Sequence, residues 1–116
     1  MAYDTRAEAL AERALPVFEQ FRGSSVALSR ESLCKRLDCQ DRLLRDAVRE
    51  LRCQGHLIVA DEAGGYRFAK SGEEVYGYTA SLKSRIQALR EVTEAMEAAA
   101  QQKFGEPVEQ LGLGLG

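Results

Sequence analysis

The sequence predicts a mainly α-helical protein with one small β-hairpin and a long C-terminal helix. Residues 29–55 hold two short amphipathic helical patterns separated by a tight turn. A strand, a glycine turn and a second strand follow at residues 57–69. From Ser71 a helical pattern continues to about Phe104, which is much longer than a small domain needs for its own core.

The chain of 116 residues has room for one compact domain and an appendage. Charged residues make up 29% of it and hydrophobic residues 45%, which is typical of a globular protein. No apolar run reaches the length of a membrane helix, about eighteen residues, and no signal-peptide pattern begins the chain. We therefore expect a soluble, cytoplasmic protein with no membrane partner, whose three cysteines are reduced.

The net charge of −2 limits the affinity that the chain can have for nucleic acid. The charges are unevenly placed, however. Residues 29–55 hold seven basic and five acidic residues, whereas residues 71–116 hold four basic and seven acidic ones. Because the first segment is only mildly basic, we expect weak non-specific binding to DNA and a need for more than one copy.

The N-terminal part has apolar residues at helical spacing over residues 4–22. Pro16 interrupts this pattern, so either one helix kinks there or Pro16 begins the first helix of the domain. We place a helical extension at residues 1–15 and the domain at residues 16–70. Residues 26–28 are then predicted to form a short strand.

The two helices of residues 29–55 differ in what they expose. Ser29 is the predicted N-cap of the first helix, whose inward residues are Leu33, Cys34 and Leu37. The second helix begins at about Asp41 and ends before Gly55, a C-terminal glycine stop. Its inward residues are Leu44, Ala47, Val48 and Leu51. Its outward basic residues include Arg42, Arg45 and Arg49.

Residues 57–69 predict a β-hairpin directly after the second helix. The apolar residues 57–60 are followed by turn residues that end in Gly64 and Gly65, and then by the alternating segment 66–69. Helix, small strand, helix, helix and hairpin is the order of a winged helix-turn-helix domain. The predicted fold is therefore a winged helix-turn-helix followed by a long helix.

The chain resembles small winged-helix proteins of phages and prophages. The segments that carry the resemblance are DRLLRDAVRELR at residues 41–52, GYRFA at residues 65–69 and SLKSRI at residues 81–86. More distantly, the chain is similar to the winged N-terminal DNA-binding domain of biotin-operon repressors. The resemblance implies a DNA-binding protein with a regulatory or replication-accessory role in a phage, prophage or plasmid.

The DNA-binding hypothesis places the second helix in the major groove of double-stranded DNA. Arg42, Arg45 and Arg49 are the expected readers, because arginine binds guanine bidentately, and Leu43 lies beside them. Gln40, or the backbone amides at the start of this helix, is expected to hold a phosphate. The expected positioning contacts are Lys35, Arg36, Arg67 and Lys70. In one alternative the arginines pair with neighbouring acidic residues, and in another the domain docks a protein and not DNA.

The helix of residues 71–104 has apolar residues in a heptad pattern. Its predicted contact positions are Val75, Leu82, Ile86, Leu89 and Met96. We expect it to join copies of the chain into a homodimer or a larger oligomer. A parallel pair would bring Arg85 against Arg90 of the other copy, so an antiparallel pair or packing on residues 4–22 of a neighbour fits better. The alternative is a helix that packs on the domain with its first half only.

Residues 105–116 are rich in glycine and predict a flexible tail. Residues 110–113, QLGL, are similar to the start of the glutamine–leucine peptides that dock bacterial sliding clamps, which would give the chain a replication protein as a partner. Gly114 stands where that motif has a large aromatic residue. A disordered tail without a partner is the other interpretation.

The sequence predicts neither an enzyme nor a cofactor. It has a single histidine and no residue set for nucleophilic or acid–base catalysis, and no phosphate-binding loop. Cys34, Cys39, Cys53 and His56 supply four possible zinc ligands. Because Cys34 and Cys39 fall at inward or turn positions, they are interpreted as small core residues, and no metal site is assigned.

Overall fold

The computed structural model of the protein describes residues 5–105. The chain divides into two compact units, Met1–Tyr76 and Gly77–Gly116. Its elements are α1 (Thr5–Gln20), α2 (Arg30–Leu37), α3 (Asp41–Cys53), β1 (Ile58–Ala60), β2 (Tyr66–Phe68) and α4 (Gly72–Phe104). The prediction of a mainly helical chain with one small hairpin and a long C-terminal helix is confirmed.

Helix α1 is continuous through Pro16, so the boundary drawn at residue 15 falls inside a helix. Leu10, Ala14 and Phe18 from both sides of the proline are buried in one core. Pro16 itself lies on the exposed face of α1, where water can bond the carbonyl group that the missing N–H leaves without a partner. The residues of the predicted extension that the structure describes are thus part of the domain's first helix.

Helix α2 has the predicted N-cap. The Ser29 hydroxyl oxygen accepts a hydrogen bond from the backbone N–H of Ser32, with a donor–acceptor distance of 3.0 Å. The helix ends at Asp38, which adopts the left-handed conformation with a φ of 51°. Both Asp38 and Cys39 donate their backbone N–H to the carbonyl oxygen of Cys34, and this closes the turn that leads into α3.

Strands β1 and β2 form an antiparallel hairpin in which Val59 is opposite Arg67. The predicted strand at residues 26–28 is reduced to an isolated bridge between Leu28 and Tyr66. Gly65 allows this close approach, because a Cβ atom at that position would lie 2.9 Å from the carbonyl oxygen of Leu28. The hairpin is thereby fixed to the segment that precedes α2.

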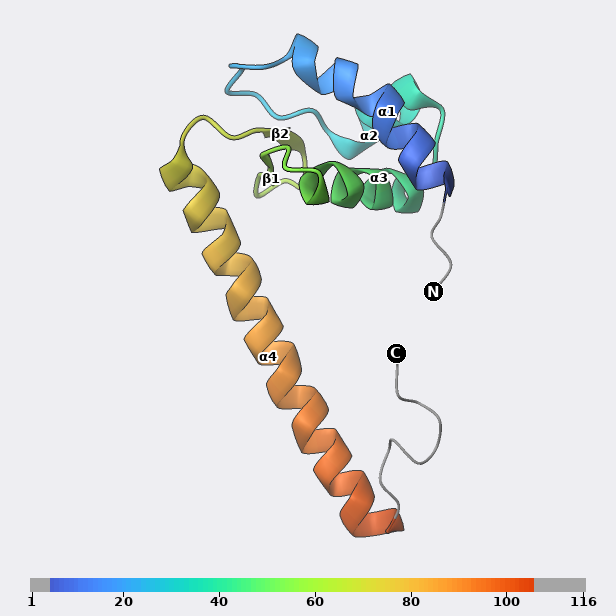
Figure 1. Ribbon diagram of the computed structural model, residues 1–116, viewed down its shortest axis with the longest axis vertical. Coiled ribbons are helices and arrows are strands. Elements are labelled where there is room, and N and C mark those ends of the chain that lie inside the picture. Colours follow the sequence, from blue (N-terminus) through green and yellow to red (C-terminus); the bar gives the residue numbers. More distant parts are fainter. Residues whose placement is uncertain (1–4, 106–116) are drawn as a thin grey trace. The chain divides into compact units, whose positions relative to one another are not determined.

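The core of the first unit is centred on Phe18 of α1. Its ring packs edge-to-face on the rings of Tyr66 and Phe68, with ring centroids 6.5 and 6.1 Å away. Figure 1 shows α1 lying along α3, with the hairpin at the C-terminal end of α3. The α3 residues buried in this core are Leu44, Ala47, Val48 and Leu51.

Helix α4 buries none of its residues. The Ser71 hydroxyl oxygen accepts a hydrogen bond from the backbone N–H of Glu74, as in a capping box. The Glu74 carboxylate does not return to Ser71, however, but bonds Arg67 and the backbone N–H of Lys70. None of the helices within residues 5–105 combines the length and apolarity required to cross a membrane.

The Leu44→Ala variant tests the contribution of α3 to the core. Leu44 is fully buried, so removing its side chain should lower the free energy of unfolding by about 2–5 kcal/mol, measured by urea denaturation. Leu57→Ala is the matched control, because Leu57 is an exposed leucine, and it should cost less than about 0.5 kcal/mol. Equal losses in the two variants would contradict this assignment of the core.

Candidate nucleic-acid interface

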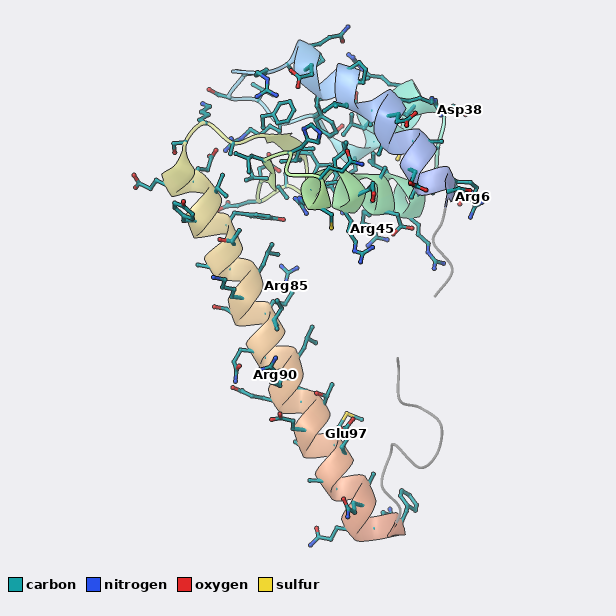
Figure 2. All side chains as sticks on the ribbon, viewed as in Figure 1. Arg6, Asp38, Arg45, Arg85, Arg90 and Glu97 are labelled. Carbon is teal, nitrogen blue, oxygen red and sulfur yellow. The ribbon has the colours of Figure 1, made fainter. Side chains whose placement is uncertain are left out.

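The exposed face of α3 carries three arginines, opposite the face that is buried in the core. Leu44, Val48 and Leu51 face the core and are almost completely buried. Arg42, Arg45 and Arg49 lie on the opposite side of the helix and are exposed. We call these three the α3 arginines. Figure 2 shows Arg45 projecting from the side of α3 that faces away from α1.

The α3 arginines differ in their partners. Arg45 pairs with Asp41, with 3.2 Å between Nε and Oδ2, and Arg30 binds the other oxygen of the same carboxylate at 3.2 Å. Arg42 and Arg49 form no ion pair or hydrogen bond through their side chains with any residue that the structure describes, although Asp46 has suitable spacing for Arg42. Two guanidinium groups on this face therefore keep all their donors for another molecule.

A groove of about 750 Å³ lies beside the start of α3, where α1 and the α2–α3 turn meet. Arg6 and Arg13 of α1 line it together with Gln40 and Arg42. Gln40 is the N-cap residue of α3, but its side chain makes no capping hydrogen bond. Because the first N–H groups of a helix attract anions, this end of α3 adds partial positive charge to the groove. The carboxylates of Asp38 and Asp46, which also line it, oppose that charge.

The expected positioning residues of α2 are exposed. Lys35 pairs with Glu31, with 3.5 Å between Nζ and Oε1. The guanidinium carbon of Arg36 lies 5.2 Å from the ring centroid of Phe21, within reach of a cation–π contact. Both contacts are at the protein surface, so they leave these two cations accessible to solvent.

Arg67 and Lys70, the expected contacts of the hairpin, both form side-chain bonds with other residues of the protein, and Lys70 remains exposed. Arg67 donates from both Nη atoms to the Glu74 carboxylate, the first of these bonds being 2.8 Å long, and its side chain is only 18% exposed. Lys70 donates from Nζ to the hydroxyl oxygen of Ser25. The exposed charges at the hairpin tip are the acidic Asp61 and Glu62. The hairpin therefore presents less positive charge than its sequence predicts.

Glu74 has a perturbed acidity because of these contacts. The Arg67 guanidinium and the backbone N–H of Lys70 lower the pKa of its carboxyl group from 4.5 to about 2. No local sequence pattern predicts this pair, because Arg67 and Glu74 are seven residues apart and belong to different elements. Leu43, predicted on the DNA-facing side, is half-buried and packs against the core.

The cysteines and the histidine do not form a cluster in the part of the chain that the structure describes. Within residues 5–105 no three histidine, cysteine, aspartate or glutamate side chains are placed to hold a metal ion. Cys34 and Cys39 pack against the core. Burial raises the pKa of the Cys39 thiol, and the neighbouring Cys34 thiol raises it further.

The sliding-clamp-like segment at residues 110–113 lies outside the described residues.

Comparison with models of known protein families and with curated proteins finds no match to this chain.

The Glu74→Gln variant tests the contact between the hairpin and the start of α4. A carboxyl group whose pKa is lowered by folding stabilises the folded state above its unfolded pKa, and this stabilisation is lost as the pH falls through the folded pKa. The melting temperature of the variant should be below that of the wild type at pH 7, and the difference should shrink between pH 4.5 and pH 2. Glu73→Gln changes an exposed neighbour and should follow the wild type throughout. A constant difference across this pH range would contradict the assignment.

Proposed function

We propose that the protein binds double-stranded DNA with α3 as its recognition helix and acts as an oligomer through α4. The proposal depends chiefly on one observation. Arg42 and Arg49 project from a helix whose opposite face is anchored in the core, and neither has an ion-pair partner among the described residues.

The spacing of the α3 arginines suits base readout. From Arg42 to Arg49 the rise along the helix is about 10 Å, close to the length of three stacked base pairs. An α-helix fits the major groove, where arginine donates two hydrogen bonds to O6 and N7 of guanine. Because the buried residues fix the rotation of α3, these side chains are directed outward without further rearrangement.

Phosphate contacts would come from the residues around the readers. The N–H groups at the start of α3 follow Gln40, which lines the groove together with Arg6 and Arg13, and are suited to one phosphate. Lys35 and Arg36 on α2 are suited to the neighbouring backbone. Arg67 would contribute little, because its guanidinium group is bonded to Glu74, whereas Lys70 is exposed and keeps its charge while bonding the Ser25 hydroxyl. These are few contacts, so the affinity of one copy is weak, and joining two copies raises it through effective concentration.

The proposed biological role is regulatory or replication-accessory in a phage, prophage or plasmid, as the resemblance implies. The second candidate is a winged-helix adaptor that docks a protein and does not bind DNA. The observation that favours it is the hairpin, whose exposed tip residues Asp61 and Glu62 are acidic, whereas Arg67 is paired with Glu74. An acidic tip is unfavourable beside a phosphate backbone and tolerable against a protein.

Two single variants, Arg42→Ala and Arg49→Ala, separate these candidates. If each side chain reads a base, each variant should weaken binding to the preferred duplex by about 5–150-fold and relax sequence preference at one position. If each instead binds a phosphate, the slope of log affinity against log salt should fall by about one for every duplex. The measurement is fluorescence anisotropy with a duplex selected from a random pool.

The matched control is Arg85→Ala, which removes the same charge from α4 and should leave duplex binding within about twofold of the wild type. Wild-type protein that selects no duplex and shifts none at low salt would overturn the DNA proposal and favour the adaptor. Equal losses in all three variants would show only a dependence on net charge, which would also overturn readout by α3.

A further inference from the structure

Helix α4 carries an apolar stripe along its central part. Four large apolar side chains of its central part are more than half exposed: Ile86 57%, Leu89 59%, Val92 54% and Met96 67%. Ile86 occupies the a position of the heptad, Leu89 and Met96 occupy d positions, and Val92 occupies the adjacent g position. A stripe of this kind in water indicates a partner helix.

The charges along α4 are separated into two blocks. Residues 83–90 contain three basic residues and no acidic one, whereas residues 91–97 contain three acidic residues and no basic one. Lys83, Arg90 and Glu97 form no ion pair within residues 5–105, and Figure 2 shows Arg90 and Glu97 projecting from the helix. The block 83–90 of one helix is therefore complementary to the block 91–97 of a second copy that runs the opposite way.

We propose that α4 pairs with α4 of a second copy in antiparallel orientation, with the twofold axis at Glu91. This inference extends the proposed oligomer by naming its partner, its direction and its register. The heptad positions restrict the register to steps of seven residues, because an antiparallel pair places a residues opposite d residues, and the axis at Glu91 is the register that brings Ile86 opposite Met96.

The resulting layers are well matched in size. Ile86 lies opposite Met96 of the second copy, and Leu82 lies opposite Ala100. Thr93 lies opposite Leu89, and its hydroxyl group already donates a hydrogen bond of 2.9 Å to the carbonyl oxygen of Arg90. The polar group of Thr93 is thus satisfied within its own helix, and its methyl group can pack in the layer.

The residues that flank these layers distinguish the two orientations. In the antiparallel pair Lys83 faces Glu97 of the second copy, twice by symmetry, and Val92 faces its own equivalent at the axis. Arg90 also faces its own equivalent there, which is the one unfavourable contact. In a parallel pair Arg85 would face Arg90 twice and Val92 would face Glu97 twice. The antiparallel pair therefore has two attractive contacts that a parallel pair lacks, and it covers Val92.

Charge reversal in the full-length chain tests the proposal, with dimer dissociation measured by sedimentation equilibrium at low salt. Lys83→Glu should weaken the dimer about tenfold, because it turns two attractive contacts with Glu97 into repulsive ones. Glu97→Lys should do the same. The combined variant Lys83→Glu/Glu97→Lys restores opposite charges and should return to within about twofold of the wild type.

Arg85→Glu is the control for orientation. In the antiparallel pair Arg85 faces Ala99, so the variant should dissociate like the wild type. In a parallel pair it would relieve repulsion from Arg90 and tighten the dimer. A dimer that Arg85→Glu tightens, and that Lys83→Glu and Glu97→Lys leave unchanged, overturns the antiparallel pair but leaves the proposed oligomer intact. A wild-type monomer at all concentrations overturns self-association itself, and DNA binding by the α3 arginines is decided separately by the anisotropy measurement.

Discussion

The burial of one face of α3 against α1 is the constraint on which the rest of the structure depends. Leu44, Val48 and Leu51 can leave water only if α3 is rotated so that Arg42 and Arg49 point outward. The same core receives Tyr66 and Phe68, which hold the hairpin next to α3. A single apolar contact surface thus positions the proposed readers and the hairpin that flanks them.

The folded geometry, and not the number of basic residues in the sequence, decides which positive charges remain unpaired at the surface. Arg45, Arg67 and Lys70 count as positive residues, yet each is bonded to a neighbouring carboxylate or hydroxyl group. Arg42 and Arg49 are not paired with any described residue. Electrostatic attraction to a polyanion would therefore be concentrated on one helix face, which favours a defined orientation over a high affinity. In the proposed oligomer, a second copy would supply the affinity that one domain lacks.

Regular periodicity explains what could be predicted from sequence. The repeat of Leu44, Ala47, Val48 and Leu51 specified α3 and its buried face, and the glycines at 64 and 65 specified the hairpin turn. Pro16 was misleading as a boundary, because a proline on the exposed side of a helix costs less than one whose carbonyl partner is buried. The contact of Arg67 with Glu74 could not be predicted, since it depends on how the chain turns between β2 and α4. Side-chain pairing between elements is set by tertiary geometry, which a local pattern does not encode.

The tip of the hairpin carries two acidic residues with different structural roles. The Asp61 carboxylate accepts a hydrogen bond of 2.8 Å from the backbone N–H of Gly65 and so holds the turn together. Glu62 is exposed, and its side chain forms no hydrogen bond or ion pair with the residues that the structure describes. The amount of negative charge at the tip can therefore be changed at position 62 alone, without loosening the loop. A single substitution at position 62 can thus change the charge of this edge of the molecule and leave the architecture unchanged.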